Sequence, residues 1–491
     1  MDRRFYLVSI LLGVLSEVAL FSRGEWDRHA PDIVKAIMVF ATGVSILLWR
    51  ICNMPFSIAI VKTSKHGTAA LLGLFGSMII YRVFFHRLRS FPGPVSAKIS
   101  AWWIFKESIP DLKFYITLRG LHERYGDFVR IKPREISICH PDAILDIHGP
   151  SRNVRKGEFY DQSHPHQTLQ FTRDPAFHRK KRVVWDKAFQ NKSVQDYMPR
   201  LKKHYGILMQ HFASHAASEE PVNVTRSFMF LGFDLISELI FGNSFNMLSA
   251  GRAKPIIGEF VKGKKMAGFT MTSIWHFHLI KALPGIEKRL TQWMRWFCRA
   301  LDKREDMDLD DPDFYTHLSQ SETWEYDRPH EAQLAIVAGS DTVSTTLTNV
   351  CYYLCQFPEY QDQLYAEIST LPDEKGLIDD QHLVQKPLLM GIINETLRLN
   401  PPVPSGVERL TPPEGAVIAG RYIPGNTVVT TPTYSLQREK RAFVNPDDFI
   451  PERWSTRPEL MLRKEAFIPF SYGAYNCAGK SLALTELRMI L

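Results

Sequence analysis

Apolar residues are spread unevenly along this chain, and three long apolar runs fall within its first 90 residues. The runs span residues 5–21, 33–49 and 67–85, and each contains one charged side chain: Glu17, Lys35 or Arg82. Each approaches the roughly 20 residues that a helix needs to cross a bilayer. Buried helices would also explain them, as would a signal peptide for the first run. Three runs without a clear small-residue cleavage site predict a membrane anchor of two or three transmembrane helices over residues 1–90.

Charge and proline mark the end of this predicted anchor. Arg87, Arg89 and Lys98 follow the third run, and positive charge favours the cytoplasmic side of a membrane. We therefore expect the anchor to contact membrane lipid, at the endoplasmic reticulum, with the rest of the chain facing the cytoplasm. Arg3 and Arg4 at the other end compete with this orientation. The Phe-Pro-Gly-Pro segment at residues 91–94 predicts a stiff hinge, because proline cannot sit inside a continuing helix.

From residue 95 onward, the pattern is mainly helical with small β insertions. Amphipathic spacing predicts helices over residues 199–213, 333–356 and 360–370, with Pro199 in the first turn of the first. Residues 228–241 are apolar but short and carry two acids, which favours a buried core helix over another membrane span. Alternating residues predict β-hairpins at 127–139 and 416–430, and the acidic residues 306–313 predict a solvated loop. The fold class expected for residues 91–491 is therefore mainly α with small β-sheets (α+β).

Composition excludes several classes of protein. The chain has 491 residues, 45% of them hydrophobic, which is ample for one large core. Its net charge of +8 is spread over 60 basic and 52 acidic residues, so we expect no nucleic-acid partner. The six cysteines form no CxxC pair, which predicts a reducing compartment and argues against zinc.

One cysteine stands in a distinctive segment. Cys477 precedes a helical pattern that begins at residue 480, and Phe470, Gly473 and Gly479 surround it. The N-terminus of a helix favours a thiolate, Gly473 permits a sharp turn, and Gly479 leaves room for a large flat ligand. Phe470 can shield the sulfur from water. A buried small hydrophobe or a nucleophilic cysteine would also explain an isolated Cys, whereas a shielded thiolate suits the proximal position of an iron porphyrin.

The segment from residue 470 to residue 479 resembles the haem-binding loop of the cytochrome P450 family. Three more segments match motifs of that family in the same order: Ala-Gly-Ser-Asp-Thr at 338–342, Glu-Thr-Leu-Arg at 395–398 and Pro-Glu-Arg-Trp at 451–454. The resemblance covers residues 91–491 and implies Cys477 as the ligand of the haem iron. One position departs from the family, because Tyr475 stands where an Arg or His usually reaches a haem propionate. This change leaves the affinity for haem in question.

The motif at residues 338–342 has two interpretations. Glycine and hydroxyl residues inside a helix are typical of a tight crossing with a second helix. The resemblance implies an oxygen-activation site instead, with Thr342 hydrogen-bonding the oxygen being activated and Asp341 relaying protons from solvent. In that interpretation Gly339 loosens the helix and makes room for O2 and water.

The charged residues of the next two motifs would form a scaffold. Alone, Glu395 and Arg398 would be an ordinary surface pair on one helix face. The resemblance implies instead a buried triad of Glu395, Arg398 and Arg453 with a structural role beside the haem loop.

A basic run at residues 178–182 is followed by Trp185. His178, Arg182 and Trp185 are spaced to lie on one face of a helix. A solvated helix face or an anion-binding patch is the usual explanation of such a run. The resemblance implies that this helix supplies hydrogen-bond donors to the haem propionates, with extra importance if Tyr475 is a weak partner.

These features lead to a functional hypothesis. The chain resembles a fungal microsomal subgroup of secondary metabolism, and the resemblance implies a membrane-anchored haem-thiolate monooxygenase that binds haem b. Its electrons would come from NADPH through a partner reductase, and its substrate would be an apolar small molecule. The chain ends fourteen residues after Cys477, where family members continue into a β-hairpin, so the alternative is a truncated homologue of weak or no activity. A cysteine-nucleophile hydrolase would need an oriented His–Asp pair that the sequence does not reveal.

Overall fold

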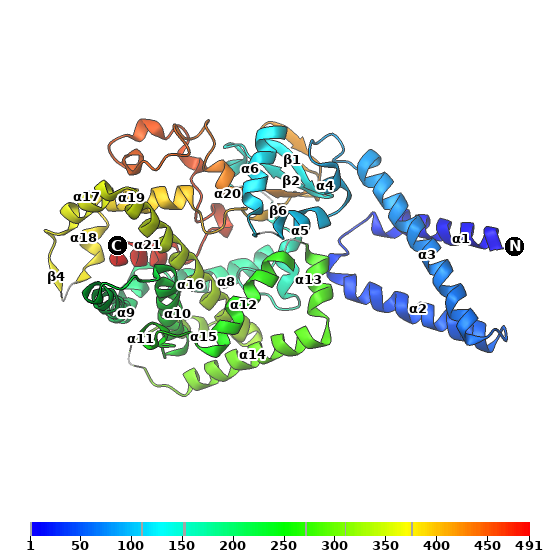
Figure 1. Ribbon diagram of the computed structural model, residues 1–491, viewed down its shortest axis with the longest axis horizontal. Coiled ribbons are helices and arrows are strands. Elements are labelled where there is room, and N and C mark those ends of the chain that lie inside the picture. The colour runs from blue at the N-terminus through cyan, green and yellow to red at the C-terminus, as the bar shows by residue number, and fades with distance from the viewer. Residues whose placement is uncertain (1, 110, 151–153, 271–272, 310, 375–376) are drawn as a thin grey trace.

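A bundle of three long helices projects from one side of a mainly helical body (Figure 1). The computed structural model describes residues 2–109, 111–150, 154–270, 273–309, 311–374 and 377–491. The projecting helices are α1 (Asp2–Ser16), α2 (Ala30–Arg50) and α3 (Phe56–Ile80). With the short helical turns beside them, they give three candidate membrane spans by length and composition: Arg4–Phe21, Asp27–Arg50 and Phe56–Phe85.

Small residues let two of these helices approach each other closely. A Cβ atom added to Gly13 of α1 would lie 2.0 Å from the carbonyl oxygen of Ala70 in α3. One added to Gly73 of α3 would lie 2.1 Å from the carbonyl oxygen of Ile10. Backbone contact of this kind is how membrane helices associate without a hydrophobic driving force.

The body is built mainly from helices. Their bounds are α4 (Val95–Ile99), α5 (Trp102–Ser108), α6 (Phe114–Tyr125), α7 (Ala143–His148), α8 (Pro175–Ala188), α9 (Asn191–Ser218), α10 (Val224–Phe241), α11 (Met247–Ala250), α12 (Pro255–Thr270), α13 (Ile274–Lys281), α14 (Pro284–Glu305), α15 (Phe314–Ser319), α16 (Trp324–Gln356), α17 (Pro358–Ile368), α18 (Asp380–Leu383), α19 (Pro387–Leu399), α20 (Thr433–Leu436) and α21 (Lys480–Ile490). The main hydrophobic core lies among α9, α10, α14, α16, α19 and α21. The fold class is therefore the one expected, mainly α with small sheets.

The main sheet has five strands in the order β1-β2-β9-β6-β3. Its strands are β1 (Phe128–Lys132), β2 (Glu135–Ile138), β3 (Arg155–Lys156), β6 (Glu408–Leu410) and β9 (Val428–Thr430). Only the β2–β9 pair is parallel. Two smaller sheets pair β4 (Asp373–Glu374) with β5 (Leu377–Ile378), and β7 (Ala416–Ile418) with β8 (Arg421–Ile423). The hairpin expected at 127–139 is confirmed, but the one at 416–430 is only partly right, because β9 leaves it for the main sheet.

The apolar stretch at residues 228–241 forms a buried core helix, as expected. In α10, the side chain of Asn223 accepts a hydrogen bond from the first turn, and Gly242 ends the helix at φ +69°. Its two acids are satisfied inside the protein. Asp234 accepts the backbone N–H groups of α11 at 2.8 Å, and Glu238 lies 2.6 Å from the ring of His204.

Two helix starts were wrong in the sequence-based prediction. Pro199 was expected in the first turn of its helix, but α9 begins at Asn191 and contains Pro199 in its interior. Similarly, α16 begins at Trp324 and contains Pro329. An interior proline costs a helix about 3 kcal/mol. In α9, fully buried side chains such as Tyr197 and Leu201 flank the proline and offset this cost by packing.

The acidic segment at residues 306–313 is not solvated along its whole length. Asp313 is fully buried. It caps α15 by accepting the backbone N–H of Thr316 at 2.9 Å, and it pairs with Arg304 of α14 at 2.9 Å. The expectation of a solvated loop was therefore wrong at Asp313, because capping and ion pairing compensate its burial.

The loop between α1 and α2 lies against the body. Arg134, in the turn between β1 and β2, donates to the carbonyl oxygen of Gly24 at 2.6 Å and pairs with Asp27 at 3.0 Å. Arg173 pairs with Glu25 at 2.7 Å. The first two candidate spans therefore meet at the end of the bundle that faces the body.

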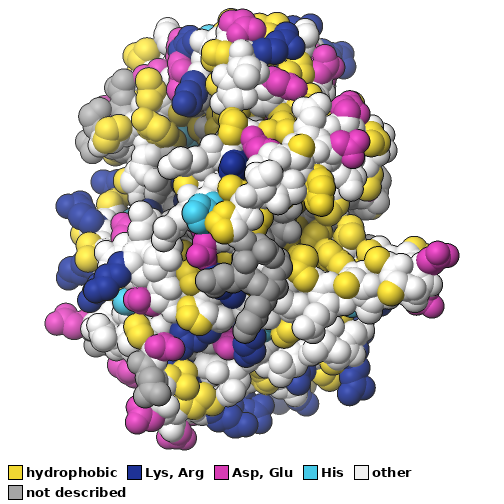
Figure 2. All heavy atoms as spheres, turned by 90° about the vertical axis from the view of Figure 1, so that its left-hand side faces the viewer, with side chains coloured by type: hydrophobic (Ala, Val, Ile, Leu, Met, Phe, Trp, Pro, Cys, Tyr) yellow, Lys and Arg dark blue, Asp and Glu magenta, His cyan; other side chains and the backbone are white. Residues whose placement is uncertain are grey.

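The face of the body opposite the bundle carries charges of both signs among apolar side chains (Figure 2).

Candidate functional site

The cysteine loop is fixed by backbone contacts. Gly473 adopts φ +71°, and a Cβ atom added to it would lie 1.8 Å from the carbonyl oxygen of His148, the last residue of α7. Only glycine fits this position without displacing backbone. The N–H of Cys477 donates to the carbonyl oxygen of Phe470 at 2.8 Å, and α21 begins three residues after the cysteine. Phe470 is partly buried and packs against the main core.

The side chain of Cys477 is accessible, but protein surrounds most of it. Its side chain is exposed, yet burial raises its pKa above that of an ordinary cysteine. These two properties coexist where a side chain is accessible but nearly surrounded by protein. A hydrogen bond from the backbone of Gly479 and the charges of Arg182 and Lys480 oppose the rise. The expectation that the helix N-terminus alone favours a thiolate was thus wrong for the free thiol, because desolvation is the larger effect. Binding to a metal deprotonates a coordinating thiol outright.

Basic side chains surround Tyr475. The ring of His178 lies 4.6 Å from the Tyr475 ring in an edge-on arrangement. The Arg409 guanidinium lies 4.9 Å and the Lys156 ammonium 5.1 Å from the same ring. Arg182 donates to the carbonyl oxygen of Asn476 at 2.6 Å. The structure therefore brings His178, Arg182 and Tyr475 together beside the cysteine loop, as expected, and adds Lys156 and Arg409 to them. We call these five residues the cation cluster.

Two members of the cation cluster are buried without an anion. Lys156 and Arg409 are 3% and 2% exposed. Among the described residues, Lys156 donates hydrogen bonds to the carbonyl oxygens of Leu169 and Gln170, and Arg409 donates to the Tyr160 hydroxyl and the Glu408 carbonyl oxygen, all of them neutral. Within the described ranges, neither forms an ion pair with a carboxylate. Burial, with Arg409 nearby, lowers the pKa of Lys156 to about 7. Burial and the neighbouring cations lower that of His178 to about 3. A ligand with carboxylate groups, such as haem, would compensate this charge.

The main sheet explains why this charge accumulates. Lys156 and Arg409 are direct partners across the antiparallel β3–β6 pair. Like charges opposite each other in a sheet are destabilising, so their pairing indicates a site for an anion. The sequence did not reveal these two residues, because the strands that carry them lie far apart along the chain. The pairing of these two strands in the sheet was the information that would have identified Lys156 and Arg409.

Trp185 does not join the cation cluster. Its ring packs 5.1 Å from Phe314 of α15, and its side chain is buried. His178 and Arg182 instead line a cavity of about 680 Å³ with Tyr475. Cys477 is not among the residues that line this cavity.

The motif in α16 serves a helix crossing on one face. A Cβ atom added to Gly232 of α10 would lie 2.8 Å from the carbonyl oxygen of Ser340, and one added to Gly339 would lie 3.1 Å from Ile236. The tight crossing considered from the sequence is therefore present. The helix is continuous through Gly339, so the expected loosening is not found.

The other face of the same motif remains accessible. Ala338 is exposed, and Asp341 and Thr342 are half-buried. The Thr342 hydroxyl donates to the carbonyl oxygen of Ala338 at 2.9 Å. The same helix α16 also packs against α21, the helix that follows Cys477.

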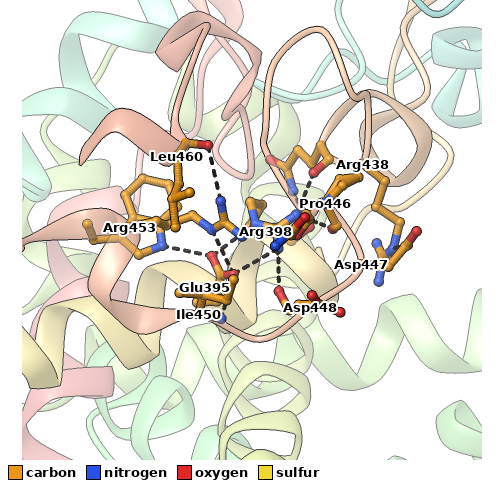
Figure 3. A network of polar contacts seen from close by, with 12 residues as sticks. Glu395, Arg398, Arg438, Pro446, Asp447, Asp448, Ile450, Arg453 and Leu460 are labelled. Atoms are coloured by element: carbon orange, nitrogen blue, oxygen red, sulfur yellow. Dashed lines mark hydrogen bonds and ion pairs between the residues drawn. The ribbon is translucent and has the colours of Figure 1, made fainter. Parts of the chain in front are cut away.

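Glu395, Arg398 and Arg453 form one buried network (Figure 3). All three side chains are fully buried. Glu395 accepts two hydrogen bonds from Arg398, at 2.8 and 2.9 Å, and one from Arg453 at 2.9 Å. The indole N–H of Trp454 and the backbone N–H of Ile450 complete the partners of this carboxylate, at 2.9 and 3.0 Å.

The two arginines also fasten the segment that leads to the cysteine loop. Arg398 donates to the carbonyl oxygens of Gln437, Pro446 and Asp448. Arg453 donates to those of Val444, Asn445 and Leu460. A single carboxylate on α19 thus orders about 25 residues of irregular chain through charge-assisted hydrogen bonds.

Comparisons with known proteins point to one family. The family model for cytochrome P450 matches residues 92–491. The chain is 36% identical to cytochrome P450 monooxygenase nodW of Hypoxylon pulicicidum, over 99% of this chain and 90% of the relative. It is 36% identical to cytochrome P450 monooxygenase FCK2 of Fusarium pseudograminearum, over 100% and 90%. It is 34% identical to tryprostatin B 6-hydroxylase of Aspergillus fumigatus, over 97% and 87%.

Proposed function

Because this chain belongs to the cytochrome P450 family and is one of its monooxygenases, we propose that it inserts one oxygen atom from O2 into an apolar small molecule of fungal secondary metabolism. The observation that carries this proposal is the juxtaposition of the accessible Cys477 thiol with the uncompensated cation cluster, which fits haem b. Haem, when bound, supplies the oxygen-activating chemistry, with electrons from NADPH that a partner reductase delivers.

The cysteine loop provides the iron ligand. Cys477 would coordinate the iron as a thiolate, and the backbone N–H of Gly479, which hydrogen-bonds the sulfur, would tune its basicity. Gly473 keeps the loop against α7, and Phe470 limits access of water. Gly479 has space beside it, since its added Cβ would lie no closer than 3.7 Å to Phe189.

The cation cluster holds the propionates. Lys156, Arg182 and Arg409 supply charge, while His178 and Tyr475 supply neutral hydrogen-bond donors. Lys156 and Arg409 thereby replace the charge that Tyr475 lacks. Trp185 belongs to the packing between α8 and α15.

Proton delivery is assigned to α16. The Thr342 hydroxyl can turn from the Ala338 carbonyl oxygen to donate to a ligand on the accessible face of α16, and Asp341 exchanges protons with solvent. The triad of Glu395, Arg398 and Arg453 has a structural role, because it orders the chain before the cysteine loop.

The anchor has three spans in this proposal. Pairing of Glu25 and Asp27 with Arg173 and Arg134 keeps the loop between α1 and α2 on the side of the body. The loop at residues 51–55 then lies across the membrane. With the body in the cytoplasm, the protein is anchored in the endoplasmic reticulum with that loop in the lumen.

Oxygen labelling tests the reaction. Microsomes that contain the full chain and an NADPH-dependent reductase are incubated with ¹⁸O2 and tryprostatin B, the compound in the name of one relative. The expected product carries one labelled oxygen and requires both NADPH and the reductase. Thr342→Val should lower the yield of product per NADPH by about tenfold or more. A product whose inserted oxygen is unlabelled would contradict the proposal.

A further inference from the structure

Three side chains with metal-binding groups meet away from the cysteine loop. His166 lies in the loop before α8, whereas Asp327 and His330 lie in the first turns of α16. One ligand atom from each residue lies within 4.8 Å of the other two. Asp327 and His330 are three residues apart on a helix, so their side chains share one face.

The spacing of these atoms is close to that of a metal site. His166 Nδ1 lies 3.1 Å from Asp327 Oδ1, and the two imidazole rings stack with centroids 3.7 Å apart. Ligands of tetrahedral zinc lie about 3.3 Å from one another, since each is about 2.0 Å from the ion. Rotation of the ring of His330 by its side-chain torsions is the adjustment that this geometry requires.

Surrounding residues orient the carboxylate. The second oxygen of Asp327 accepts the backbone N–H of Gln167 at 3.2 Å, which leaves Oδ1 directed at His166. The nearest cation, Lys181, lies 3.9 Å from that second oxygen but 2.8 Å from Glu331. Glu331 therefore compensates most of the charge of Lys181. The backbone N–H of Gln167 holds the Asp327 carboxylate in the orientation that a metal ligand needs.

His330 supplies an independent indication. Its Nδ1 atom is buried and has no hydrogen-bond partner among the described residues. A buried nitrogen without a partner is costly, and a bound metal with its water ligand would provide one. His166 keeps 41% of its side chain exposed, which gives an ion a route from solvent.

We propose that His166, Asp327 and His330 form a Zn²⁺ site, completed by water, that is distinct from the haem iron. Two imidazoles and one carboxylate favour zinc over Ca²⁺ or Mg²⁺, which prefer oxygen ligands. Zn²⁺ would join the loop before α8 to the start of α16. The same loop already contacts α16 and β3. The backbone N–H of Leu169 donates to Glu331 of α16 at 3.0 Å, and the carbonyl oxygen of Leu169 accepts a hydrogen bond from Lys156 of β3 at 2.9 Å.

Metal analysis of the haem-loaded full chain in lipid nanodiscs tests the site. After equilibration with micromolar Zn²⁺ and dialysis, we expect about one Zn²⁺ per chain. His166→Gln and His330→Ala should each lower this occupancy at least tenfold. His382→Ala, which removes an exposed histidine from α18, should leave it unchanged. The haem spectrum of each variant shows whether it is folded.

A second measurement covers the case in which His330→Ala fails to fold. Zn²⁺ should raise the unfolding temperature of the wild-type protein and leave that of His166→Gln unchanged, since His166 is exposed enough to tolerate substitution. Absence of retained Zn²⁺ in the wild type would overturn the proposal. So would equal occupancy in wild type, His166→Gln and His330→Ala, which would mean that His166 and Asp327 form only a hydrogen bond.

Discussion

Lys156 is a single residue whose charge has a measurable role. If it faces a haem propionate, Lys156→Met removes a charge-assisted hydrogen bond worth about 1.5–3 kcal/mol. We expect this variant to release haem about 10- to 100-fold faster, as measured by transfer of haem to a scavenger protein. Lys180→Met removes an exposed lysine of α8 and should release haem at the wild-type rate. Equal rates for both variants would contradict the assignment of Lys156.

The pH dependence of haem binding follows from the same residue. Without haem, the pKa of Lys156 is about 7, and propionates would raise it. Above pH 7, the free protein has then lost a proton that the haem complex keeps, so binding takes up a proton. We expect haem affinity to fall by up to about tenfold per pH unit above pH 7, and Lys156→Met to lack this slope. A haem affinity that rises above pH 7 in the wild type, but not in Lys156→Met, would contradict the prediction that haem binding takes up a proton at Lys156.

Glu395 tests the structural triad. Glu395→Gln leaves two buried arginines without their anion, which costs about 3–5 kcal/mol of folding free energy. We expect a large fall in the unfolding temperature and in the yield of haem-loaded protein. Arg463→Gln breaks ion pairs of an arginine whose side chain is 40% exposed. This change should cost less than about 1 kcal/mol of folding free energy. Similar falls in unfolding temperature for the two variants would contradict a structural role of the triad.

Residues that act through local sequence could be identified before the structure was known. Cys477, the triad and the pair His178 and Arg182 stand in recognisable segments, and the structure brings each set into contact. Lys156 and Arg409 could not be identified, because their significance comes from pairing across a sheet. Trp185 shows the opposite error, since helical spacing alone does not tell which side of a helix packs against the core.

At the scale of elements, two glycines of the cysteine loop make different predictions. Gly473→Ala would place a methyl group against the backbone of α7 and should prevent haem incorporation by displacing the loop. Gly479→Ala meets only ordinary contacts in the protein, so the polypeptide should fold. If haem lies against Gly479, this variant should still shift the haem spectrum. Normal haem incorporation in Gly473→Ala, measured by haem content per chain, would contradict the role given to the α7 contact.

Elements formed by neighbouring residues were also the ones that sequence predicted best. The hairpin of β1 and β2 and the buried helix α10 were both predicted from local patterns. Strand β9 was assigned to the wrong partner, because its parallel pairing with β2 joins residues almost 300 positions apart. The start of α9 was missed for a related reason, since tertiary packing overrides the preference of Pro199 for a first turn.

At the scale of the whole molecule, two native cysteines report the topology of the anchor. Cys52 lies in the loop between α2 and α3, Cys355 lies on α16 in the body, and both are exposed. In sealed microsomes, a membrane-impermeant maleimide should label Cys355 and spare Cys52. Both should react after the membrane is permeabilised. Mass spectrometry of the two cysteine-containing peptides measures the labelling. Labelling of Cys52 in sealed microsomes would contradict an anchor of three spans.

The absorption spectrum of the reduced, CO-bound protein tests the central claim that Cys477 ligates haem iron as a thiolate. The purified full chain should show the red-shifted Soret band of a thiolate-ligated haem. Cys477→Ala should lack that shift, whereas Cys355→Ala should keep it. A wild-type Soret band without the shift, or an unchanged shift in Cys477→Ala, would contradict the account.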